Sequence, residues 1–96
     1  MMYELDCRYD TRASFYGKAK VLEQDIGTTG FSEVVLYSYD TMVAKIIKGK
    51  NTTKYIYYGK YSQTTTRHQK EFFRQNGLTE TEIKELFNKG VLIYEL

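Results

Sequence analysis

His68 is the only histidine in this 96-residue chain, and histidine is the side chain best suited to move protons near neutral pH. A metal site would need further His, Cys or carboxylate ligands at a suitable spacing, and none lies nearby in the sequence. A hydroxyl nucleophile paired with a histidine base would need a third group to orient the ring, and local spacing offers none. We therefore expect a structural histidine that packs on Phe72 and bonds a backbone group or a hydroxyl. A direct contact between this ring and a partner stays open.

Cys7 is the only cysteine, so the chain cannot form an internal disulfide, and a cysteine-ligated zinc site would lack its other ligands. We expect a small thiol that is partly buried or on the surface. No pair of carboxylates converges in the sequence pattern either. The residue types therefore predict a protein that is not an enzyme, with no catalytic residue, no metal and no cofactor.

Positive charge gathers in the middle of the chain. Residues 41–74 hold eight basic residues and one acid, a net charge of +7, whereas the rest holds six basic and eleven acidic residues, a net charge of −5. Such segregation favours a charged binding surface. Tyrosines lie among these basic residues. The candidate partner-binding residues are Lys45, Lys54, Tyr55, Tyr57, Lys60, Arg67, Lys70 and Arg74.

Two interpretations of this pattern stay open. Basic residues interleaved with aromatic rings are typical of proteins that bind single-stranded nucleic acid, where charge follows the phosphates and rings stack on bases. Tyr is also a favoured strand residue, and Lys protects sheet edges. No helix-turn-helix, zinc finger or ribonucleoprotein motif accompanies the basic segment.

Alternating residues and short connections predict an antiparallel meander. The expected strands are Phe15–Leu22, Glu33–Tyr39, Met42–Lys48, Thr53–Tyr58 and a short C-terminal strand, Val91–Tyr94. Tyr3–Cys7 alternates loosely and is a further strand candidate. The expected connections are a loop over Asp25–Gly30 and turns at Asp40-Thr41 and Gly49–Thr52.

The period then changes to that of helices. Ser62 or Thr64 can cap a first helix that Asn76-Gly77 ends, with Phe72 and Phe73 on one side. Its basic residues, Arg67, Lys70 and Arg74, fall on the opposite side. The threonine run 64–66 fits either simple capping or anion binding at the helix N-terminus.

A second helix begins at once and ends at Gly90. Its capping box is Thr79–Glu82, and its acids Glu80, Glu82 and Glu85 match the helix dipole. Its apolar stripe consists of Ile83, Leu86 and Phe87. The fold class that follows is α+β: an antiparallel sheet of four or five strands, with two helices packed on one face and a short C-terminal strand.

Length predicts a single domain over residues 1–96. No apolar run approaches the roughly 20 residues that a membrane span needs. The N-terminus MMYELDCRYD lacks the basic start and apolar centre of a secretory signal. We therefore expect a protein of a reducing cytoplasm that does not bind a membrane. The oligomeric state stays open.

Three blocks of the sequence resemble a family of short phage and prophage proteins of low-GC Gram-positive bacteria. The blocks are SFYGKA from Ser14, LYSYDTMVA from Leu36, and YSQTTTRHQKEF from Tyr61. The resemblance ends near Gly77 and implies a bacteriophage or mobile-element origin, with the cytoplasm of the bacterial host as the compartment. It supplies no activity.

The function expected from these observations is a small phage-encoded binding protein that inhibits a host machine by protein–protein contact, for example an anti-CRISPR-like factor acting against a defence complex that handles nucleic acid. The alternative is an accessory protein that binds nucleic acid directly through residues 41–74. In that case Arg67, Lys70 and Arg74 contact phosphates, the three lysines 45, 54 and 60 extend the basic surface across the sheet, and Tyr55 or Tyr57 stacks on bases.

Overall fold

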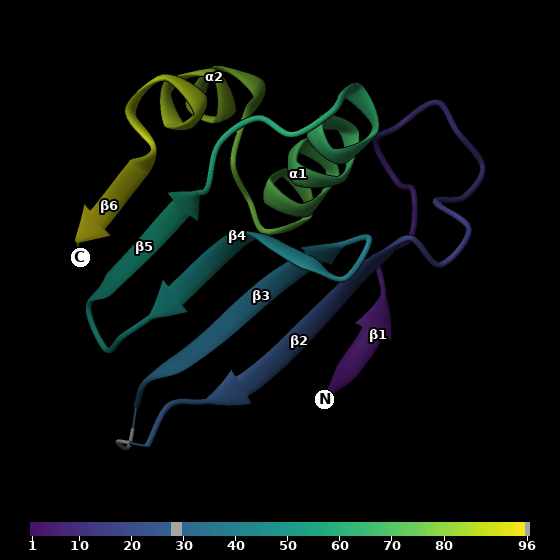
Figure 1. Ribbon diagram of the computed structural model, residues 1–96. Helices are drawn as coiled ribbons and strands as arrows, with labels where there is room; N and C mark the ends of the chain where they lie inside the picture. The colour runs from purple at the N-terminus through teal and green to yellow at the C-terminus, as the bar shows by residue number, and fades with distance from the viewer. Residues whose placement is uncertain (28–29, 96) are drawn as a thin grey trace.

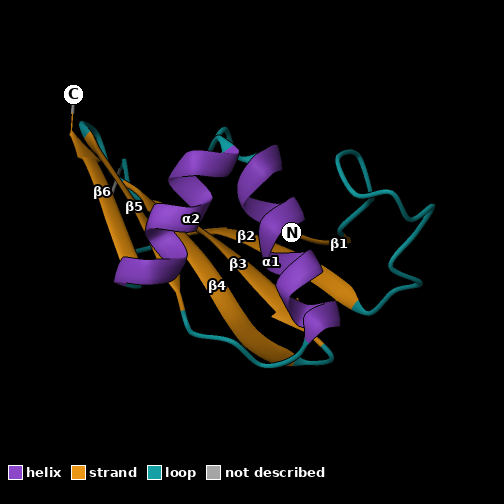
Figure 2. Cartoon of the chain, turned by 90° about the horizontal axis from the view of Figure 1, so that it is seen from above, coloured by secondary structure: helices purple, strands orange, loops and turns teal. Residues whose placement is uncertain are grey.

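The strands lie side by side in chain order in one antiparallel sheet, and both helices cover the same face of it (Figures 1 and 2). The computed structural model describes residues 1–27 and 30–95. The strands are β1 (Met2–Glu4), β2 (Ala19–Asp25), β3 (Ser32–Ser38), β4 (Thr41–Lys48), β5 (Thr52–Tyr57) and β6 (Val91–Glu95), and the helices are α1 (Gln63–Gln75) and α2 (Glu80–Lys89). The α+β prediction is confirmed. The sheet has six strands within the described residues because both terminal segments pair with it.

β2 begins later than the sequence pattern predicts. The backbone turns at Tyr16 and Gly17, whose φ angles are 53° and 73°, so extended pairing cannot start at Phe15. Phe15 nevertheless reaches the core, and Ala19 and Val21 occupy the buried face that the alternation predicts. Residues 28 and 29 of the expected loop lie outside the described part of the chain.

The connection between β3 and β4 is a two-residue hairpin turn. Ser38 pairs with Thr41, and Tyr39 and Asp40 between them have φ angles of 50° and 67°. Two successive positive φ values match a type I′ turn, whose twist suits the flanking strands. A bulge follows, because Leu36 pairs with Ala44 while Tyr37 pairs with Met42, which leaves Val43 as the extra residue.

Local chemistry fixes the ends of both helices. Ser62 caps α1 by accepting a hydrogen bond from the Thr65 amide at 3.1 Å, and Gly77 ends it with a φ of 96°. Thr79 and Glu82 form the predicted capping box of α2, and Gly90 ends that helix in the left-handed conformation. Neither helix of the described chain is long and apolar enough to cross a membrane.

The core lies between the helices and one sheet face. Phe72, Phe73 and Leu86 are fully buried against strand residues such as Leu36 and Ile46. The side-chain amide of Gln69 donates to the carbonyl oxygens of Val43 and Gly59, so α1 is bonded directly to the bulge. This packing holds α1 with its basic side turned away from the sheet.

Candidate binding groove beside the first helix

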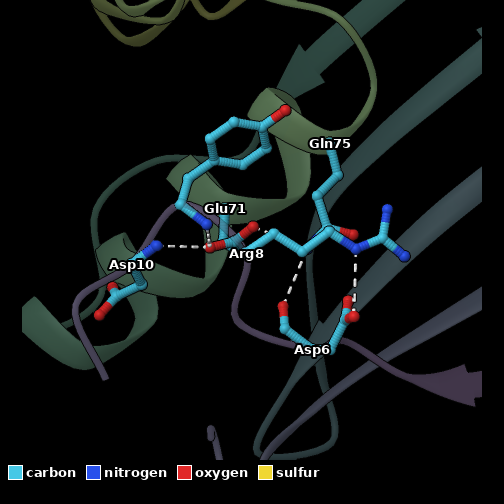
Figure 3. A network of polar contacts seen from close by, with 6 residues as sticks. Asp6, Arg8, Asp10, Glu71 and Gln75 are labelled. Atoms are coloured by element: carbon cyan, nitrogen blue, oxygen red, sulfur yellow. Dashed lines mark hydrogen bonds and ion pairs between the residues drawn. The ribbon is translucent and has the colours of Figure 1, made fainter. Parts of the chain in front are cut away.

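Glu71 joins α1 to the loop that connects β1 and β2 (Figure 3). Its Oε1 atom accepts hydrogen bonds from the backbone amides of Tyr9 and Asp10 at 2.9 and 2.8 Å. Its Oε2 atom accepts from the Gln75 side-chain amide at 2.6 Å, and Gln75 also donates to the Asp6 carbonyl oxygen at 2.8 Å. Only 2% of Glu71 is exposed. The lone acid of the basic segment therefore anchors the loop on the helix.

The anchored loop engages two of the three cations on the outer side of α1. Asp10 Oδ1 lies 3.3 Å from Arg67 Nη1, and the guanidinium carbon of Arg74 lies 4.7 Å from the centre of the Tyr9 ring. The first contact is an ion pair, and the second is a cation–π interaction. Sequence periodicity correctly places Arg67, Lys70 and Arg74 on one side of the helix, but it gives no sign of these loop partners.

A groove of about 370 Å³, which we call the helix groove, lies between this loop, α1 and α2. Its lining residues are Tyr9, Asp10, Arg67, Lys70, Glu71, Arg74, Glu80, Ile83, Lys84 and Phe87. Four of them are cations and three are acids, and one acid is the buried Glu71. Lys70 and Lys84 are exposed, and neither has an ion-pair partner among the residues that the structure describes. The groove can therefore attract an anionic group beside the apolar side chains of Ile83 and Phe87.

The other candidate residues do not join this groove. Strand register places Lys45 and Lys54 on the sheet face away from the helices, where Lys45 Nζ lies 3.5 Å from Glu33 Oε2. Lys60 is exposed in the connection before α1. The expectation of one basic surface running from α1 across the sheet is therefore wrong, because strand alternation puts Lys45 and Lys54 on the face away from the helices.

Tyr55 and Tyr57 point toward the helices and pack on other rings. Tyr57 stacks on Phe87 with 4.1 Å between ring centres, and Tyr55 makes edge contacts with Phe73 and Tyr94. Burial raises the pKa of both phenols. Both rings are half-buried and already contact other rings of the fold, which leaves less of each ring for stacking on a base.

His68 is 1% exposed and lies outside the helix groove. Its Nδ1 atom is 2.8 Å from Ser38 Oγ, which agrees with the expected hydroxyl partner, and Ser38 Oγ is 2.9 Å from Thr65 Oγ1. The expected ring partner is wrong: the imidazole packs edge-on against Phe15, at 4.5 Å between centres, because the first loop folds over α1. Burial lowers the pKa of His68. Its Nε2 atom has no hydrogen-bond partner among the described residues.

Comparison with known proteins identifies a family but no activity. The matching family model covers residues 3–89 and is described as a family of unknown function (DUF8033). No curated protein and no solved structure matches the chain. The match includes α2, so the expectation that family resemblance ends near Gly77 is wrong.

Proposed function

The chain belongs to the DUF8033 family, whose function is unknown, and we propose that it is a small, non-enzymatic binding protein that holds an acidic segment of a partner protein in the helix groove. In this proposal Lys70 and Lys84 attract the carboxylates of the segment. The half-buried ring of Phe87 receives an apolar or aromatic side chain between those carboxylates, above the buried Ile83.

The observation that carries this proposal is the pair of exposed lysines in the groove. Lys70 comes from α1 and Lys84 from α2, and the described chain supplies no carboxylate within ion-pair distance of either ammonium group. Arg67 differs, since Asp10 already neutralises much of its charge. Charge complementarity of this kind mainly accelerates association and selects the partner, while an apolar anchor slows dissociation.

A protein partner fits the geometry better than single-stranded nucleic acid does. Stacking on bases needs exposed ring faces beside the phosphate-binding cations. The rings of Tyr55 and Tyr57 are instead half-buried against other aromatic rings, and Lys54 lies on the opposite side of the sheet. The helix groove keeps a few cations beside apolar surface, which suits a peptide segment with mixed acidic and apolar side chains.

The sequence blocks that resemble phage and prophage proteins suggest where this binding takes place. We place the protein in the cytoplasm of a bacterial host, where it inhibits a host machine by contact, in the manner of an anti-CRISPR factor acting on a defence complex. An inhibitor of this kind needs a complementary surface and no catalytic group. Small size and the composition of the groove are compatible with that role.

The test compares capture of host proteins by two charge-reversed variants. Lys70→Glu/Lys84→Glu changes the groove, while Lys48→Glu/Lys50→Glu makes the same charge change at the β4–β5 turn, outside the groove. We expect the wild type and the turn variant to retain the same host protein from lysate, and the groove variant to lose it. Equal urea midpoints must show that both variants fold. Capture that survives the groove substitutions, or phage growth that needs the gene while no host protein is retained, contradicts the proposal.

Titration with labelled oligonucleotides distinguishes the nucleic-acid alternative. Each phosphate neutralised on a single strand contributes about −0.7 to the slope of log K against log salt, so the three cations Lys70, Arg74 and Lys84 would give a slope of about −2. If such binding exists and the groove variant abolishes it, the partner is nucleic acid. The protein proposal predicts no binding with that salt dependence.

A further inference from the structure

Within residues 1–27 and 30–95, no helix lies on the second face of the sheet. Both helices lie on the opposite face (Figure 2), and the molecule measures 36 × 29 × 21 Å, a thickness that accommodates one sheet and one helix layer. The register of the strands defines which residues lie on this uncovered face, which we call the open face. From β1 to β6 they are Met2, Glu4, Lys20, Leu22, Gln24, Glu33, Val35, Tyr37, Met42, Lys45, Ile47, Thr52, Lys54, Ile56, Val91, Ile93 and Glu95.

Apolar side chains run across the open face in one row. The row contains Met2, Leu22, Val35, Ile56 and Val91, with Lys45 as its one charged member. Val35 is only 2% exposed although no helix covers it, whereas Ile93 near the edge is 54% exposed. The accessible apolar area of the row therefore comes from Met2, Leu22, Ile56 and Val91, on either side of Val35 and Lys45. Exposed apolar patches of this kind often mark interaction sites.

The charges of the open face balance. Three lysines (Lys20, Lys45 and Lys54) face three carboxylates (Glu4, Glu33 and Glu95). The face therefore selects neither a strongly acidic nor a strongly basic partner, in contrast to the helix groove. A second copy of the same face is balanced in the same way.

We propose that two copies of the chain pair through their open faces, about a two-fold axis that runs parallel to the strands between β3 and β4. This rotation stacks β2 of one copy on β5 of the other and β3 on β4. Leu22 then lies over Ile56 of the second copy, and Tyr37 over Met42. Two sheets packed in this aligned manner cross at about −30°, so the central strands meet and the corners diverge.

The same rotation brings Lys54 near an opposite charge, and it offsets the two Lys45 side chains, which lie on either side of the axis, by one strand. Lys54 of one copy lies over Gln24 of the other and beside Glu33, so its ammonium group can reach that carboxylate. Lys45 lies over Val35. An axis perpendicular to the strands that passes through the row of Val35 and Lys45 would instead stack each strand on its own copy and set the two Lys45 side chains directly against each other. The parallel axis is therefore the one that this face favours.

The size of the face sets the expected strength. Six strands about 4.8 Å apart and three rows of side chains give a face of roughly 24 × 20 Å, or about 500 Å². Two such faces bury about 1,000 Å², somewhat less than a standard interface of roughly 1,200–2,000 Å². We therefore expect a dimer that dissociates on dilution within about 1–500 μM.

Sedimentation equilibrium on the full chain tests the pairing. The mass should rise with concentration from the 11.3 kDa of one chain toward twice that value. Ile56→Lys places a charge on the open face and should hold the chain as a monomer. Thr81→Lys adds the same charge on exposed α2 and should leave the dimer unchanged. Equal urea midpoints at low concentration show that both variants fold.

A charge-swap cycle tests the axis. Gln24→Lys should weaken the dimer at least tenfold because it opposes Lys54 of the second copy, and Lys54→Glu added to it should restore the dimer. Restoration supports the parallel axis, and failure to restore refutes it. A chain that stays monomeric throughout, or a dimer that Ile56→Lys leaves intact, overturns the proposal. A monomer whose capture of a host protein is lost on Ile56→Lys assigns the open face to that protein instead, and also overturns it.

Discussion

Replacing Glu71 by Ala should remove the contact that holds the first loop on α1. The carboxylate accepts two backbone amides, from Tyr9 and Asp10, and one side-chain amide from Gln75. A hydrogen bond to a charged group contributes about 1.5–3 kcal/mol. Gln75 can turn to water, and the two backbone amides are partly buried, so we expect a loss of about 3 kcal/mol. That is a large part of the roughly 5–15 kcal/mol that stabilises a domain of this size.

Glu71→Gln should cost less because its side-chain oxygen can still accept both backbone amides. Loss of the charge roughly halves such bonds, so we expect about 1–1.5 kcal/mol. For a urea m-value of about 1.5 kcal/mol/M, the midpoint should fall by about 2 M for Ala and by about 0.7–1 M for Gln. Glu85→Ala is the matched control, because this exposed carboxylate only pairs with Lys89 in the next helical turn and should cost about 0.3–0.5 kcal/mol.

Local probes distinguish a loosened loop from general destabilisation. Burial, with help from Asp10 and Glu71, raises the pKa of Cys7 in the same loop, so its thiol should react slowly with a thiol reagent. In Glu71→Ala that reaction and the hydrogen exchange of the Tyr9 and Asp10 amides should accelerate under native conditions. Equal midpoints for the Ala and Gln variants, or unchanged Cys7 reactivity in the Ala variant, would refute the assigned role.

Three further predictions concern the core, a helix cap and a turn. Burial lowers the pKa of His68, so as the pH falls the imidazole is protonated in the unfolded chain before it is protonated in the folded one. The free energy of unfolding should therefore be highest above about pH 6.5 and should decrease below that pH, by at most about 1.4 kcal/mol per pH unit. Urea melts of His68→Gln between about pH 5.5 and 7.5 should lack this slope, and a slope equal to that of the wild type would exclude His68 as its source. Thr79→Ala should cost about 1 kcal/mol by thermal melting through loss of the capping box, whereas Thr81→Ala should change stability by less than about 0.5 kcal/mol; equal effects would contradict the cap. Asp40→Gly should raise the free energy of unfolding by about 0.5–1 kcal/mol, because a φ of 67° is more favourable for glycine than for aspartate. A lower urea midpoint for the variant would contradict this prediction.

Features of the fold that depend on neighbouring residues could be predicted from the sequence. The ends of both helices depend on residues within a few positions of each end. These are the Ser62 hydroxyl, the capping box of Thr79 and Glu82, and the left-handed glycines 77 and 90. Alternation fixed β3 to β5 to within a residue or two for the same reason. The start of β2 could not be placed, because it depends on a turn at Tyr16 whose positive φ has no strong sequence signal.

In the candidate site too, features set by nearby residues could be predicted from the sequence, and contacts between distant segments could not. The helical period predicts that Arg67, Lys70 and Arg74 share one side of α1. It cannot predict that Glu71 binds a loop about 60 residues earlier in the chain, or that Phe15 from that loop packs on His68. The period does put Glu71 near Arg67 and Arg74. The sequence shows that Glu71 is the only acid among the basic residues of this segment, which could point to a structural role. It does not show that the carboxylate is buried, because burial depends on the folded loop.

Strand composition explains why the open face exists. Apolar residues occupy both faces of the central strands, as Val34 and Val35 in β3 and Ile46 and Ile47 in β4 show. Strands with this pattern are typical of sheets that are covered on both sides. The described chain supplies two helices, and both pack on the face of Val34 and Ile46. A sequence that specifies two apolar sheet faces and one helix layer leaves the face of Val35 and Ile47 to be covered from outside the chain. In the proposed dimer, a second copy covers it with a matching surface.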